Sequence, residues 1–225
     1  MLDVTPTILR ASLVNLELVF ALLGVGLVIG TAIAVLQVYG GRVASKIAYV
    51  YEWIFRSIPA LVLIFLFYFG PSKFGLFINA FQAAVLALGL RSSAYQSQIF
   101  RGAIEAIPAG QMQAARSMGM GKVRAVVSVI LPQAFRLSIA GWTNEFSSVI
   151  KDTTLAYAAG FTEILRTARA IYDTRIYLTM PTLLLVAVVF LVFTYAGNRA
   201  LGLLERRIAI PGLQMPGTVG RMEQT

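Results

Sequence analysis

The chain has 225 residues, of which 58% are hydrophobic and 13% charged, and this balance predicts an all-α integral membrane protein because a soluble core needs less apolar surface. Its net charge is +9, but the basic residues flank apolar runs and form no basic stripe with interleaved aromatics, which argues against nucleic acid as a partner. The lack of cysteine and histidine excludes disulfides, Cys/His zinc sites and imidazole-based catalysis, so we expect no metal, no cofactor and no enzyme.

Five segments are long and apolar enough to be membrane spans, since a spanning helix needs about 20 predominantly apolar residues. They are residues 18–41, 53–72, 74–100, 125–144 and 176–198. The first and last are uncharged, whereas the middle three contain Arg56, Arg91 and Arg136. Pro132 lies inside the fourth segment and predicts a bend there, because proline removes a helix hydrogen bond.

The short loops predict the orientation, because Lys and Arg accumulate on the cytoplasmic side. The larger basic group comprises Arg42, Lys46, Arg56, Arg101, Arg116, Lys122, Arg124, Arg199, Arg206 and Arg207. We therefore expect an external N-terminus, a cytoplasmic C-terminus, and an external connection over residues 150–175 that contains short helical structure or lines the outer mouth. Arg10 and Glu17 interrupt the N-terminal run, so we expect the first helix to be retained. Residues 1–225 read as one domain with a flexible tail at 211–225.

Residues 108–121 are too polar and too short to cross a bilayer, and they predict a surface helix of about two turns. Pro108 suits the start of this helix and Gly119 suits the left-handed position that ends one. Because an isolated helix of this length is marginal in water, we expect it to be held in a groove of a partner.

The spacing around this segment is informative. It reads Gln113-Ala114-Ala115, three residues, Gly119, nine residues, and Val129-Ile130-Leu131-Pro132. This resembles the EAA signature of binding-protein-dependent ABC importer permeases, with Gln113 in place of Glu and Val129 in place of Ile. In that family the segment is a cytoplasmic coupling helix that docks on the ATPase subunit. The resemblance implies this coupling role for Gln111, Gln113, Ala114, Ala115, Arg116, Met118 and Gly119.

Six further blocks are similar to the polar amino acid subfamily of these permeases. They are residues 56–59 (RSIP), 93–102 (SAYQSQIFRG), 131–134 (LPQA), 144–145 (NE), 151–155 (KDTTL) and 204–207 (LERR). Gln98 departs from the acidic residue often found there. The resemblance implies a type I ABC importer transmembrane domain in a prokaryotic inner membrane, carrying polar or charged amino acids. It also implies three kinds of partner: two ATPase subunits, an identical or homologous permease chain, and an extracytoplasmic substrate-binding protein.

Arg91 is the strongest candidate for a substrate contact, because a charge at membrane depth costs a few kcal/mol unless it faces protein or water. Ser92, Ser93 and Tyr95 follow it, and a guanidinium offers a planar fork that matches a carboxylate. The alternative is a structural Arg91 paired with Glu145 or with helix-end carbonyls. The candidate pathway residues are Arg91, Ser92, Ser93, Tyr95, Glu145, Lys151 and Asp152, with Lys151 and Asp152 equally open to being a solvated pair.

Other functions have less support. Residues 119–122 (GMGK) lack the earlier glycine and the following Ser or Thr of a phosphate-binding loop, so ATP hydrolysis is expected on another chain. An ion-coupled secondary transporter would show inverted repeats, and a membrane enzyme would need paired intramembrane carboxylates or a His or Cys. The Gly26-xxx-Gly30 pair in the first span is compatible with a dimer contact or with ordinary helix packing.

Overall fold

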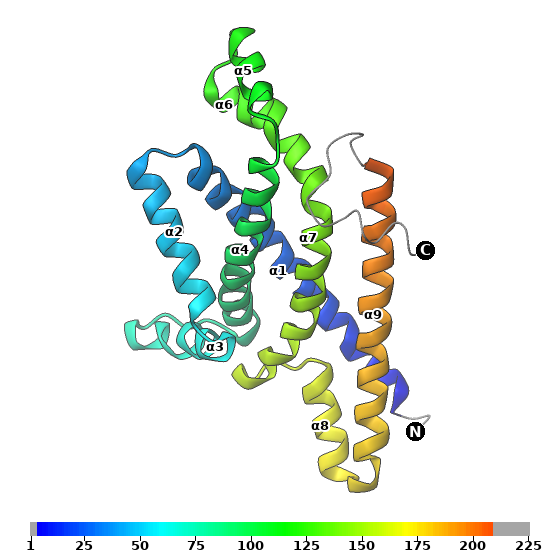
Figure 1. Cartoon of the computed structure of the whole chain (residues 1–225). Coiled ribbons are helices and arrows are strands. Elements are labelled where there is room, and N and C mark those ends of the chain that lie inside the picture. The colour runs from blue at the N-terminus through cyan, green and yellow to red at the C-terminus, as the bar shows by residue number, and fades with distance from the viewer. Residues whose placement is uncertain (1–3, 209–225) are drawn as a thin grey trace.

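The computed structural model describes residues 4–208, which form helices joined by short connections, with no strand in that range (Figure 1). The elements are α1 (Thr5–Tyr39), α2 (Arg42–Ser57), α3 (Ala60–Phe69), η1 (Pro71–Phe74), α4 (Ala80–Glu105), α5 (Ala109–Ser117), α6 (Lys122–Ala125), η2 (Val126–Ile130), α7 (Leu131–Asp152), η3 (Thr153–Ala159), α8 (Ile164–Thr174), η4 (Ile176–Leu178) and α9 (Thr179–Ile208). The predicted tail at 211–225 lies outside the described residues.

Three described helical stretches are long and apolar enough to cross a membrane: Thr5–Tyr39, Lys122–Ala159 and Ile176–Ile208. The helices Arg42–Ser57 and Ala60–Phe74 are long and apolar enough to cross a membrane only when taken together, and the chain bends by 101° between them. Helix α4 is 26 residues long, which is enough to cross a membrane, but its polar side chains make it less apolar than these helices. The five expected spans therefore correspond to α1, the bent α2 and α3 pair, α4, α7 and α9.

The expectation of a continuous second span over residues 53–72 is wrong, because the helix breaks at Ile58 and Pro59. Ile58 adopts an extended conformation, with φ −82° and ψ 130°. A residue before proline is disfavoured in the helical region, since the proline ring clashes with its backbone. The chain therefore turns sharply here, and α3 leaves α2 at a steep angle (Figure 1).

The third and fourth predicted spans also have different limits in the structure. Gly75, at φ +74°, ends η1, and Asn79 starts α4 by exchanging capping hydrogen bonds with Gln82, so the helix begins at Ala80 instead of residue 74. Where the sequence predicts a bend at Pro132, the structure has a π-helical turn immediately before it, over Val126–Ile130.

Helices α1 and α4 form the most extensive helix contact in the described chain, and small residues allow their close approach. A Cβ on Gly26 would lie 2.0 Å from Nε2 of Gln96, and one on Gly30 would lie 2.8 Å from the Ser93 carbonyl oxygen. The glycine pair therefore serves packing within one chain, which is the second of the two alternatives raised by the sequence.

The elements outside the spans lie at opposite ends of the molecule. Figure 1 shows α5 and α6 projecting at one end, while α8 lies at the other beside the start of α9. Buried Ile8 of α1 joins Ile164 and Ala168 of α8 in an apolar cluster with α9. The predicted short helices of residues 150–175 are confirmed as η3 and α8.

Candidate functional site

Arg91 forms an ion pair with Asp152, which brings together α4 and the end of α7. Its Nη1 donates to Oδ2 of Asp152 at 2.7 Å, and the two side chains are 25% and 29% exposed. The guanidinium also lies over the ring of Tyr95, 4.9 Å from the centroid. The structural alternative for Arg91 named Glu145 or helix-end carbonyls as its partner, whereas the partner in the structure is Asp152. Asp152 pairs with Arg91 and not with Lys151, whose side chain is exposed.

A buried polar network lies beside this pair. Ser92 donates to Glu145 at 2.6 Å, Gln96 donates to Ser92 at 3.2 Å, and the Trp142 indole donates to Gln96 at 2.7 Å. Ser92, Gln96 and Glu145 are all buried. Ser93 is also buried and shares a 2.6 Å hydrogen bond with the Tyr51 hydroxyl. Of the predicted pathway residues, these serines and Glu145 connect helices from buried positions, whereas Arg91, Tyr95 and Asp152 are partly exposed and Lys151 is exposed.

Glu52 is the centre of a second cluster that the sequence analysis did not select. Its carboxylate accepts hydrogen bonds from Gln37 of α1 at 2.7 Å, from Arg56 at 3.1 Å, and from Gln98 of α4. Gln98, which the sequence resemblance marked as a departure from an acidic residue, thus donates through its amide to a carboxylate. The only sequence signal for this cluster was the spacing of Glu52 and Arg56 on one helix face.

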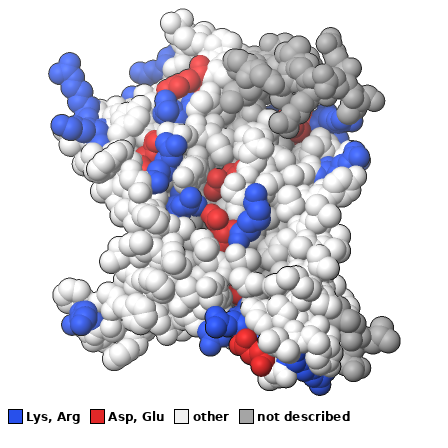
Figure 2. All heavy atoms as spheres, turned by 60° about the horizontal axis from the view of Figure 1, so that its bottom comes forward, with Lys and Arg blue, Asp and Glu red and all other residues white. Residues whose placement is uncertain are grey.

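Tyr95 connects the two clusters. The guanidinium of Arg56 lies 5.0 Å from its ring centroid, and that of Arg91 lies 4.9 Å from it. Figure 2 shows charged side chains of both signs close together near the centre of the view, among uncharged residues. Charged side chains on membrane-spanning helices are expected to face protein or water instead of lipid.

Asn15, Thr153 and Glu163 form a third polar cluster at the α8 end. Asn15 donates to Thr153 at 3.0 Å and to Glu163 at 3.3 Å, and the Glu163 carboxylate accepts the backbone N–H groups of Leu165 and Arg166 at the start of α8. Burial raises the pKa of Glu163 above its ordinary value of 4.5, while these hydrogen bonds lower it. The sequence did not single out this cluster, because Asn15 is more than 130 residues away from Thr153 and Glu163 along the chain.

The coupling segment is an ordered helix with an exposed surface. Gly119, at φ +82°, ends α5, and two hydrogen bonds close the last turn, from Gly119 N to Arg116 O at 3.0 Å and from Met120 N to Ala115 O at 3.1 Å. Ala115 is buried against its own chain, whereas Met118 is 79% exposed. The other predicted coupling residues are also exposed: Gln111, Gln113, Ala114, Arg116 and Gly119.

Comparison with known proteins agrees with this arrangement. Residues 26–210 match the family described as binding-protein-dependent transport system inner membrane component. The nopaline transport system permease protein NocM of Agrobacterium fabrum (strain C58 / ATCC 33970) is 32% identical over 89% of this chain and 87% of its own. The probable glutamine ABC transporter permease protein GlnM of Bacillus subtilis (strain 168) is 30% identical over 84% and 87%.

Among solved structures, the crystal structure of an amino acid ABC transporter with histidines contains a similar chain. It superposes with a TM-score of 0.81 at 33% identity, covering 92% of this chain and 96% of that one. The family match over residues 26–210 begins within α1, at Gly26, and includes all of α2, α4 and α7, which hold the two clusters around α4. The chain belongs to the family of binding-protein-dependent transport system inner membrane components, which are permease subunits of ABC importers and not enzymes.

Proposed function

We propose that this permease forms, with a second identical or homologous permease chain, the membrane pathway for polar or charged amino acids. An extracytoplasmic binding protein delivers the substrate, and two copies of a separate ATPase drive transport. The observation that carries the substrate class is the partly exposed Arg91 and Asp152 pair at membrane depth. The names of relatives support it, since one is described for nopaline and another for glutamine.

The Arg91 and Asp152 pair offers the two charges that an amino acid requires. A guanidinium can take the α-carboxylate in a bidentate contact, and a carboxylate can take the α-ammonium. Without substrate the two side chains satisfy each other at 2.7 Å, which avoids an unpaired charge at membrane depth. Substrate thus exchanges one ion pair for two, and the buried Ser92 and Glu145 contact holds α4 against α7 while this happens.

The exposed face of α5 is the proposed docking surface for the ATPase. Met118 supplies apolar area, and Gln111 and Gln113 supply hydrogen-bonding groups. Buried Ala115 positions the helix against its own chain and leaves these side chains outward. ATP binding and hydrolysis then bias the two facing states of the pathway through this helix, by differential affinity for each state.

Uptake measured in proteoliposomes tests the proposal. With the binding protein and ATPase subunits present, amino-acid uptake is expected to require ATP and to stop when the ATPase is omitted. Uptake that persists without the ATPase and follows an ion gradient would instead establish a secondary transporter. Competition among acidic, amide and basic amino acids would then define the substrate.

The proposed orientation places the N-terminus and α8 outside and α5 in the cytoplasm. The separation of α5 and α8 at opposite ends supports it (Figure 1). Because the chain has no native cysteine, single cysteines introduced at Thr5, Ser117 and Thr174 can be labelled with a membrane-impermeant reagent in intact cells. Labelling is expected at positions 5 and 174 only, and labelling at position 117 would reverse the topology.

A further inference from the structure

Helix α2 has a polar face turned toward its own chain and an apolar face turned outward, the opposite of an amphipathic helix in a soluble protein. Its carboxylate Glu52 is buried, while Val43 and Trp53 on the outer surface are 74% and 70% exposed, and Ile47 and Val50 are exposed between them. Among the described residues, only α1 and α4 contact α2 extensively, so this face is left free. An exposed face with this composition fits lipid hydrocarbon.

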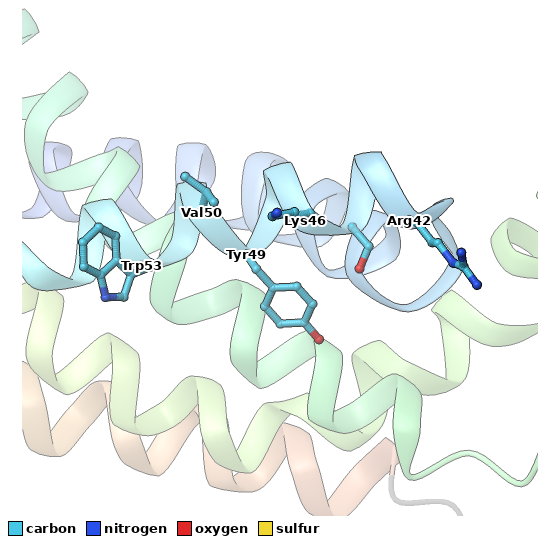
Figure 3. Close-up of a pocket in the computed structure, with 6 residues that line it drawn as sticks. Arg42, Lys46, Tyr49, Val50 and Trp53 are labelled. Atoms are coloured by element: carbon cyan, nitrogen blue, oxygen red, sulfur yellow. The ribbon is translucent and has the colours of Figure 1, made fainter.

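Two cations lie at one end of this apolar face. Arg42 and Lys46 are one helical turn apart, both are exposed, and neither side chain makes a hydrogen bond or ion pair within residues 4–208. A surface hollow of about 550 Å³ runs from them along Ser45, Tyr49, Val50 and Trp53 (Figure 3). A second hollow, of about 420 Å³, uses the same two cations with Val43, Ile47 and Val50.

We propose that this surface binds an anionic phospholipid. The phosphate contacts Arg42 and Lys46, and one acyl chain lies along Val50 and Trp53. The combination of two unpaired cations with a mainly apolar continuation matches a lipid that has a charged head and a hydrocarbon tail.

The position of the site along the membrane supports this ligand. Lys122, which follows α5, donates to the carbonyl of Tyr39 at 2.6 Å, just before the turn that leads to Arg42. The cations are therefore at the α5 end, which the proposed orientation places in the cytoplasmic leaflet, where anionic lipids attract Lys and Arg.

Native mass spectrometry of the full chain in detergent, titrated with phosphatidylglycerol or phosphatidylcholine, tests the proposal. We expect phosphatidylglycerol to bind more tightly, and the double variant Arg42→Gln with Lys46→Gln to lose about 25-fold in that affinity, about fivefold per cation. Phosphatidylcholine binding should not change. Lys73→Gln, an exposed lysine beyond α3, is the matched control and should behave like the wild type.

Three results would overturn the proposal. The first is an unchanged preference for phosphatidylglycerol in the double variant. The second is binding of glycerol 3-phosphate as tightly as phosphatidylglycerol, which would show that the site binds phosphate and does not bind the acyl chain. The third is efficient disulfide formation between permease chains carrying Ile47→Cys, which would show that a second copy covers this face. ATP-driven uptake is measured separately, so failure of the lipid site is distinguishable from failure of the transport proposal.

Discussion

Helices α4 and α5 follow each other in the chain but depend on their surroundings in opposite ways. In α4, Ser92, Ser93 and Gln96 are buried and make hydrogen bonds to other helices, whereas in α5 only Ala115 is buried. The position of α4 is therefore set by its own chain, while most of the α5 surface is left exposed and is proposed to dock on the ATPase. Changes around α4 should reduce folding stability, and changes in α5 should reduce coupling to the ATPase.

The largest loss of stability is expected for Gly30→Val. The new Cβ would lie 2.8 Å from the Ser93 carbonyl oxygen, and because this is backbone, α1 and α4 must separate, at a cost of about 3 kcal/mol. Gly24→Val is the matched control, since a Cβ at Gly24 meets nothing within 4 Å. Thermal unfolding in detergent compares the two, and equal unfolding midpoints would contradict the close packing of α1 on α4.

A smaller loss, about 2 kcal/mol, is expected for Glu163→Ala, because two backbone N–H groups of α8 and the Asn15 amide lose their acceptor. Asp173→Ala, on the exposed Arg169 and Asp173 pair of the same helix, is the control and should change the unfolding midpoint little. A large effect of the control would show that α8 is sensitive to any loss of a carboxylate.

Glu163 should also make the stability of the protein depend on pH. Burial raises the folded-state pKa of Glu163 above 4.5, so the folded state binds the proton more tightly than the unfolded state. Its contribution to stability is greatest below about pH 4.5 and is lost as the pH rises through the folded pKa. Between about pH 5 and about pH 8 the unfolding midpoint of Glu163→Gln should therefore fall less than that of the wild type. If the unfolding midpoints of the wild type and Glu163→Gln fall equally with pH, Glu163 does not cause the pH dependence.

Gly119→Val should cost only about 1 kcal/mol in stability, because the strain of a β-branched residue at φ +82° is confined to the end of α5. Membrane abundance should stay near normal while ATPase stimulation by the binding protein falls strongly. Gly121→Val is the control, since Gly121 has φ −63° and a Cβ there also meets open space. Normal stimulation in Gly119→Val would remove the coupling role of this helix end.

The smallest stability change, below about 1 kcal/mol, is expected for Arg91→Lys, because both members of the ion pair are partly exposed. Lysine keeps the charge but loses the planar fork, so the apparent affinity for transported amino acid should weaken. Arg91→Gln should weaken it further. If Arg91→Gln assembles and transports with unchanged affinity, Arg91 does not contact substrate; if it fails to assemble, Arg91 is structural.

The sequence by itself determined those features that depend on local chemistry. Uncharged runs identified the first and last spans, and Pro108 and Gly119 predicted the start and end of α5, because both residues act through their own backbone angles. The break at Pro59 also has a local cause, but the prediction of a continuous span over residues 53–72 did not use this proline.

Only the tertiary structure decided which side chains meet. Arg91 pairs with Asp152, 61 positions away, and not with Glu145, and Asn15 reaches Glu163 across 148 positions. Such pairs depend on the depth and rotation of one helix relative to another. Hydropathy sets neither quantity, because a residue's apolar neighbours along the chain show that its helix is buried in lipid or protein but not which helix it faces.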